Sequence, residues 1–83
     1  MSRAWIETRL AMADRHVMET RASIAFQRIK IESLKGRERE RSLTAHMARD
    51  LLQSLQDELA MHLAERERFR HWMAKAHERA PQK

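Results

Sequence analysis

The sequence predicts an all-α protein, an antiparallel two-helix hairpin that dimerises into a four-helix bundle. Three observations lead to this fold class. The 83-residue chain has one glycine and one proline, so it lacks the residues that punctuate strands and turns. Charged residues make up 35% and hydrophobic residues 42% of the chain, as in long helices and coiled coils. Each half also repeats apolar residues at alternating spacings of three and four, the heptad pattern of helices packed lengthwise.

The first helix is expected over residues 3–35. Its heptad seam runs through Ile6, Leu10, Ala13, Val17, Thr20, Ile24, Gln27, Ile31 and Leu34. Ser2 is suited to cap the start of the helix, because a serine hydroxyl accepts a hydrogen bond from the first-turn amides. Gly36 follows the last seam residue, where a glycine in a left-handed conformation commonly ends a helix.

The second helix is expected over residues 42–79. Its seam runs through Ala45, Ala48, Leu52, Leu55, Leu59, His62, Arg66, Phe69, Met73 and Ala76. Ser42 or Thr44 is suited to cap its start. The proline lies beyond the last seam residue and does not interrupt the helix.

We therefore expect a single domain over residues 1–83, with a charged turn at 36–41 and a short tail at 80–83. A connection this short makes the two helices antiparallel neighbours. The competing interpretation is one continuous rod that tolerates Gly36 inside it, at a cost of about 1 kcal/mol relative to Ala.

A chain of this length buries only part of its apolar surface when it folds alone, so the isolated hairpin should be marginally stable. It has no cysteine, which excludes disulfides and thiolate metal sites as sources of stability. Association of two copies is another way in which a small scaffold gains stability. We therefore expect a homodimer, and the same surface would suit another protein partner.

Large apolar residues beside the seams identify the surface for this association. They are Trp5, Met12 and Phe26 on the first helix, and Met47, Leu51, Met61 and Trp72 on the second. In a hairpin that turns near Gly36, facing residue numbers sum to about 77. Trp5 and Trp72 should then lie level at the open end, on the same flank.

Polar residues interrupt both seams. Thr20 and Gln27 interrupt the first, and His62 and Arg66 the second. His62 should lie level with about residues 14–16 and Arg66 with about residues 10–12, and Asp14 is the leading candidate to pair with either. Unpaired buried polar groups are costly, so we interpret these five residues as a polar layer that fixes the register. A ligand-binding or catalytic layer is the alternative.

Two His-x-x-Glu pairs, His16 with Glu19 and His62 with Glu65, would each place an imidazole and a carboxylate on one helix face. Glu58 also precedes His62 by one helical turn. Metal-binding bundles use a fuller and differently ordered ligand set, so we expect no metal site and no cofactor.

The sequence has no glycine-rich phosphate loop and no nucleophile elbow. We therefore expect a protein that is not an enzyme.

The net charge of +5 raises the possibility of nucleic-acid binding. Candidate contacts, interleaved with Phe69 and Trp72, are Arg68, Arg70, Lys75 and Arg79. Because acidic residues lie among these bases, we favour solvated helix faces over a nucleic-acid site.

No apolar run approaches the roughly 18 residues of a membrane span. The first residues also lack a signal peptide's apolar core, so we expect a cytoplasmic protein without a membrane partner.

Part of the pattern resembles that of a known group of proteins. The residues that carry the resemblance are Arg15-His16-Val17, Ile24, Gln27-Arg28, Ile31, Leu34, Gly36-Arg37, Leu51-Leu52, Leu55, Leu59, His62-Leu63-Ala64, Arg66 and Arg68. Over residues 5–70 the chain resembles small uncharacterised helical-hairpin (coiled-coil) proteins of rhizobia-like bacteria. The resemblance implies a hairpin and a bacterial cytoplasmic setting, and it implies no activity and no functional residue.

These observations favour a small helical protein–protein interaction module, a scaffold or regulator that acts as a homodimer. One alternative is a basic nucleic-acid-binding protein. A second alternative is a metal- or ligand-binding helical bundle.

Overall fold

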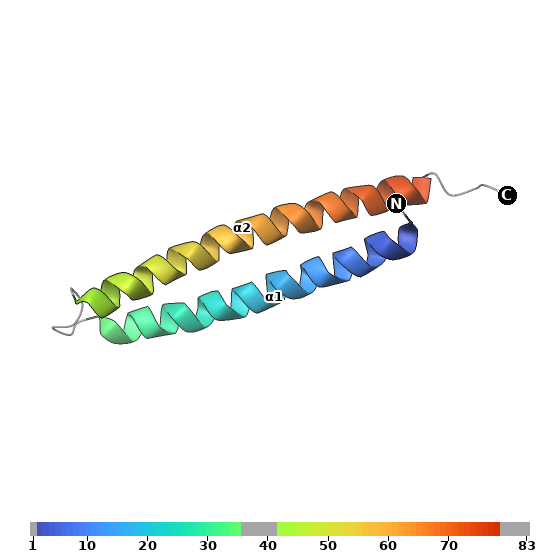
Figure 1. Cartoon of the computed structure of the whole chain (residues 1–83). Coiled ribbons are helices and arrows are strands. Elements are labelled where there is room, and N and C mark those ends of the chain that lie inside the picture. Colours follow the sequence, from blue (N-terminus) through green and yellow to red (C-terminus); the bar gives the residue numbers. More distant parts are fainter. Residues whose placement is uncertain (1, 36–41, 79–83) are drawn as a thin grey trace.

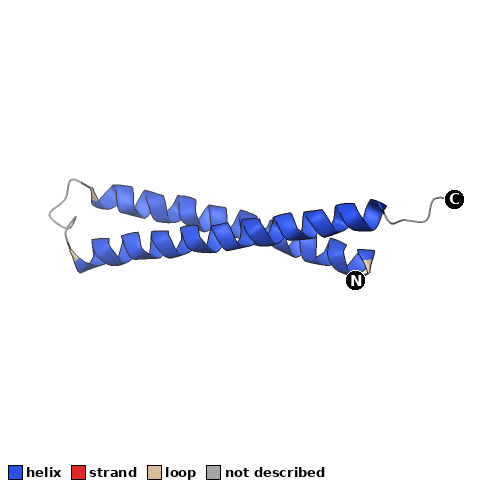
Figure 2. Cartoon of the chain, turned by 90° about the horizontal axis from the view of Figure 1, so that it is seen from above, coloured by secondary structure: helices blue, strands red, loops and turns tan. Residues whose placement is uncertain are grey.

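The computed structural model is an antiparallel hairpin of two long helices, and it describes residues 2–35 and 42–78 (Figure 1). Helix α1 spans Arg3–Leu34 and helix α2 spans Leu43–Glu78, and these described residues contain no strand. The Cα positions extend over 69 × 14 × 14 Å, the dimensions of a narrow rod. Seen from above, the two helices cross along their length (Figure 2). The hairpin, and not the continuous rod, is therefore confirmed.

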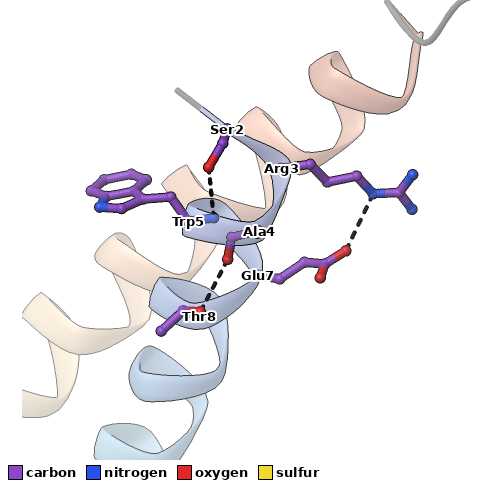
Figure 3. Close-up of polar contacts among 6 residues, drawn as sticks. All are labelled: Ser2, Arg3, Ala4, Trp5, Glu7 and Thr8. Atoms are coloured by element: carbon purple, nitrogen blue, oxygen red, sulfur yellow. Dashed lines mark hydrogen bonds and ion pairs between the residues drawn. The ribbon is translucent and has the colours of Figure 1, made fainter.

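Helix α1 begins with the cap that the sequence predicts. Ser2 is extended, at φ −74° and ψ 151°, and its hydroxyl accepts a hydrogen bond from the Trp5 amide at 3.1 Å. Figure 3 shows this contact beside the exposed pair of Arg3 Nε and Glu7 Oε1, which are 3.2 Å apart. The cap satisfies an amide that has no partner within the helix.

The other end of α1 comes one residue earlier than the expected bound of 35. Lys35 is extended, at φ −67° and ψ 144°, and its amide donates to the Glu32 carbonyl at 3.2 Å. The expectation for Gly36, the turn at 36–41 and the tail at 80–83 all lie outside the described residues.

Helix α2 begins one residue after the expected bound of 42. Ser42 is its cap, since the Ser42 hydroxyl accepts from the Ala45 amide at 3.2 Å. Thr44, the alternative cap, lies inside the helix. Residue 79, the expected end of this helix, is outside the described residues, and the assigned helix ends at Glu78.

The core is a single seam between the two helices. On α1 the buried residues all belong to the predicted seam: Ile6, Ala13, Val17, Thr20, Ile24 and Gln27. On α2 only Ala45 is fully buried among the described residues, and the rest of its seam is half-buried. Two helices can cover one stripe on each other and no more, so much apolar surface stays in solvent.

Candidate interaction surface

Three aromatic rings close the open end of the hairpin. Phe69, from the seam of α2, contacts Trp5 of α1 edge to face, with ring centroids 5.9 Å apart and planes at 70°. The Phe69 and Trp72 rings are 5.4 Å apart at 78°. Such pairs contribute about 0.5–1.5 kcal/mol beyond area burial. Trp72 lies at the open end and is half-buried, and the part of its ring that stays exposed leaves its predicted role in the interaction surface a prediction.

The remaining predicted surface residues are exposed. We call the following set the apolar flank: Trp5, Met12, Phe26, Met47, Leu51 and Met61, with 40% to 71% of each residue accessible. Phe26 and Leu51 come from different helices and line one shallow groove of about 480 Å³, together with Ser23 and Leu55. This shared groove shows that the two helices present this part of the flank on one side of the hairpin.

Other apolar residues point elsewhere. Met18, Ile29 and Leu43 are each at least 67% exposed. At about 100° per residue, Met18 and Ile29 lie on the outer side of α1, away from the line of Trp5 and Met12. They provide matched positions for testing the apolar flank.

The predicted polar layer is partly assembled as expected. Arg66 Nη1 lies 3.7 Å from Asp14 Oδ1 on the opposite helix. His62, in contrast, has its acidic partner on its own helix, with Nε2 3.3 Å from Glu58 Oε1. This contact corrects the expectation of an acidic or amide partner for His62 from α1. Its nearest ring on that helix belongs to His16, with centroids 4.9 Å apart.

The contact between His16 and His62 was missed by sequence reasoning. His16 lies one residue before the seam residue Val17, and the seven-residue repeat places that position at the edge of the interface. Two buried atoms of this layer, His16 Nδ1 and Arg66 Nε, have no hydrogen-bond partner. Such atoms typically cost about 1–3 kcal/mol each, so the layer contributes register more than stability.

The two amide and hydroxyl residues of the layer are both buried in the seam. Gln27 is 4% exposed, and its Nε2 donates to the Ala48 carbonyl of α2 at 2.8 Å. Thr20 is 6% exposed. Gln27 thus joins the helices at a level far from the pair of Asp14 and Arg66.

The basic candidates lie on the surface of α2. Arg68, Arg70 and Lys75 are exposed, and Arg70 Nη1 is 3.7 Å from Glu67 Oε2 in its own helix. Arg79 lies outside the described residues. The structure therefore places acidic side chains among these bases, as the sequence suggests.

The His-x-x-Glu pairs do not gather further ligands. Within 2–35 and 42–78, no three His, Cys, Asp or Glu residues are placed to hold a metal ion. The same described segments contain no helix that is long and apolar enough to span a membrane.

Comparison of the chain with protein-family models, curated proteins and solved structures gives no match. The resemblance to hairpin proteins of rhizobia-like bacteria therefore stays a prediction. Functional inference rests on the surface chemistry of the hairpin itself.

Proposed function

We propose that the protein is a small helical interaction module, a non-catalytic scaffold or regulator, that works as a homodimer. Two hairpins would join through the apolar flank and form a four-helix bundle. The sequence resemblance supports a setting in the bacterial cytoplasm.

The exposure of the apolar flank is the observation that carries this proposal. Six large apolar side chains on one flank are 40% to 71% accessible, whereas soluble monomers rarely expose extended apolar patches. Fully burying one such side chain contributes roughly 1.5–3 kcal/mol. Partial burial of several would offset the low stability of a single hairpin.

Two matched methionine substitutions test the homodimer. Met61 on the apolar flank and Met18 on the outer side of α1 are both 71% exposed. We expect Met61→Glu to convert the protein to monomers, because burying a carboxylate without a partner is costly. Met18→Glu should leave the dimer intact. Light scattering at micromolar concentration should give about twice the chain mass of 9.9 kDa for wild type and Met18→Glu.

A wild-type protein that stays monomeric at those concentrations would contradict the homodimer. Equal effects of the two substitutions would contradict the assignment of the interface to this flank. Met61 is preferable to Trp72 for the test, because Trp72 packs on Phe69 and its loss would also damage the hairpin.

Nucleic-acid binding is the second candidate, and it rests on the net charge of +5 and on the exposed bases Arg68, Arg70 and Lys75 of α2. Phosphate contacts release counterions, so such binding would weaken steeply as salt is raised. A salt titration with duplex and single-stranded probes separates this candidate from the interaction module.

A further inference from the structure

Four residues of the flank recur on both helices in opposite directions, whereas Glu65 and Lys30, which line grooves on this flank, have no charged counterpart. Along α1 the order is Trp5, Arg9, Glu19 and Ser23, and backward along α2 it is Trp72, Arg68, Glu58 and Ser54. The intervals are 4, 10 and 4 residues in both cases. Because the helices are antiparallel, matching residues lie level with one another.

Contacts across the hairpin fix these levels. His16 faces His62, Gln27 bonds to the Ala48 carbonyl, and Trp5 contacts Phe69. Together with the pair of Asp14 and Arg66, these contacts join residues whose numbers sum to between 74 and 80, a range centred on the 77 expected for equal rise along both helices. The four matched pairs form four successive bands across the flank: aromatic, basic, acidic and serine.

The charged bands lie at the surface of the hairpin, and Glu58 within them already contacts His62 of its own helix at 3.3 Å. The basic band is Arg9 with Arg68, and the acidic band is Glu19 with Glu58, and all four residues are exposed. The Arg9 guanidinium lies 5.3 Å from the centre of the Trp5 ring, which holds it on the same side as the apolar flank. Ten residues of helix separate the two bands, or about 15 Å.

We infer that two copies pair antiparallel with their flanks face to face, related by a two-fold axis perpendicular to the rod. The axis lies midway between the basic and acidic bands and not at the middle of the rod, so the two copies are staggered along their length. The axis crosses the flank near the levels of Met12 and Met61, where Glu65 also lies, lining a groove with Met61 and Arg68. The inference rests on the proposed homodimer and specifies its geometry. Each Arg9 then faces Glu19 of the second copy, and each Arg68 faces Glu58 of the second copy. The two-fold axis repeats both pairs, so the flank is complementary to itself.

The same stagger places the aromatic band of one copy against the serine band of the other. The Trp5 and Trp72 level of one copy falls on the Ser23 and Ser54 level of the other. Small serine side chains leave room there, and the groove of about 480 Å³ beside Ser23 lies at this level. The open end of each hairpin would thus fill the groove of its partner.

Charge excludes the two simpler arrangements. A two-fold axis along the rod would set Arg9 against Arg68 of the second copy and Glu19 against Glu58. An antiparallel pairing centred on the middle of α1 would bring the two acidic bands face to face. Like charges juxtaposed across an interface suppress association, so the stagger is the arrangement that pairs opposite charges.

Charge reversal on α1 tests the stagger. Arg9→Glu would place two like-charged pairs in the interface and should raise the dimer dissociation constant about tenfold at low salt. Adding Glu19→Arg in the same chain should restore the constant to within about threefold. The two positions are about 15 Å apart within one chain, so this rescue can only act between copies. Arg15→Glu, an equal charge change on the outer side of α1, is the matched control and should have no effect.

Sedimentation equilibrium gives the constants, and thermal melting of each variant verifies that the hairpin is folded. Should Arg9→Glu fail to fold, Arg68→Glu with its rescue Glu58→Arg repeats the test on α2. A monomeric wild type would overturn the homodimer and with it the stagger. If the wild type is dimeric but Arg9→Glu lowers its dissociation constant or leaves it unchanged, or if adding Glu19→Arg does not restore the constant, the stagger is overturned and the homodimer stands.

Discussion

At the scale of single residues, Gln27 decides how the two helices align. Its side chain is buried in the seam and donates across it to the Ala48 carbonyl at 2.8 Å. A buried amide is satisfied only when this carbonyl lies opposite, so a shift along the seam would leave it without a partner. One polar residue thereby favours one register among several that the apolar residues alone would tolerate.

We expect Gln27→Ala to lower the free energy of unfolding by about 1–2 kcal/mol, through the lost hydrogen bond and the lost packing. Gln53→Ala is the control, because Gln53 is exposed and bonds only to Asp57 of its own helix. That change should stay within about 0.5 kcal/mol of wild type. Urea denaturation measures both, and equal losses would contradict a special role for Gln27.

The polar contacts around Arg66, unlike the hydrogen bond of Gln27, leave buried polar atoms without partners. Its guanidinium reaches Asp14 across the seam, but Arg66 Nε is buried without a partner. The ring contact between His16 and His62 adds a second polar group at the same place. The unpaired buried atoms of this layer limit the stability of the hairpin.

At the scale of the helices, the serine caps set where each one begins. Neither helix has an acidic residue in its first turn, so no side-chain charge there stabilises the positive end of the helix dipole. The hydroxyls of Ser2 and Ser42 are the side chains that accept from first-turn amides. Their loss would therefore not be compensated locally.

We expect Ser42→Ala to lower the free energy of unfolding by about 1 kcal/mol, because the Ala45 amide loses its partner. Ser33→Ala is the control, since the Ser33 hydroxyl bonds to the Lys30 carbonyl of its own helix at 2.7 Å. Such bonding inside a helix adds little or no stability. Chemical denaturation of the two variants should separate them, and a neutral Ser42→Ala would refute the cap's contribution.

At the scale of the whole molecule, the rod is narrow and its core is one seam thick. Among the described residues of α2, only Ala45 is fully buried. A second hairpin on the apolar flank would turn two half-covered helices into members of a bundle. Folding and association would then be coupled, as in small proteins whose monomers are marginal.

Coupled folding and association predicts a melting temperature that rises with protein concentration. From the enthalpy expected for two chains of 83 residues, each tenfold increase should raise it by about 4 °C. Circular dichroism over a hundredfold range of concentration measures the shift. Met61→Glu should melt lower and without this dependence, and a wild-type melting temperature independent of concentration would argue for a stable monomer.

The sequence by itself determined the all-α hairpin, the seam of α1 and the ends of the helices to within one residue wherever the structure describes them. These features are local, because helix propensity, a heptad repeat and a serine cap all act within a few residues. The sequence also named Asp14 as a candidate partner for His62 or Arg66, and the structure pairs it with Arg66.

Only the tertiary structure decided how the side chains share the interface. It turned Trp72 onto Phe69, paired His62 with Glu58 and brought the His16 ring to His62. These outcomes depend on rotamers and on the packing of one helix against the other, which sequence spacing does not contain. The charge bands became visible for the same reason, because residues far apart in the chain share a level only once the two helices lie side by side.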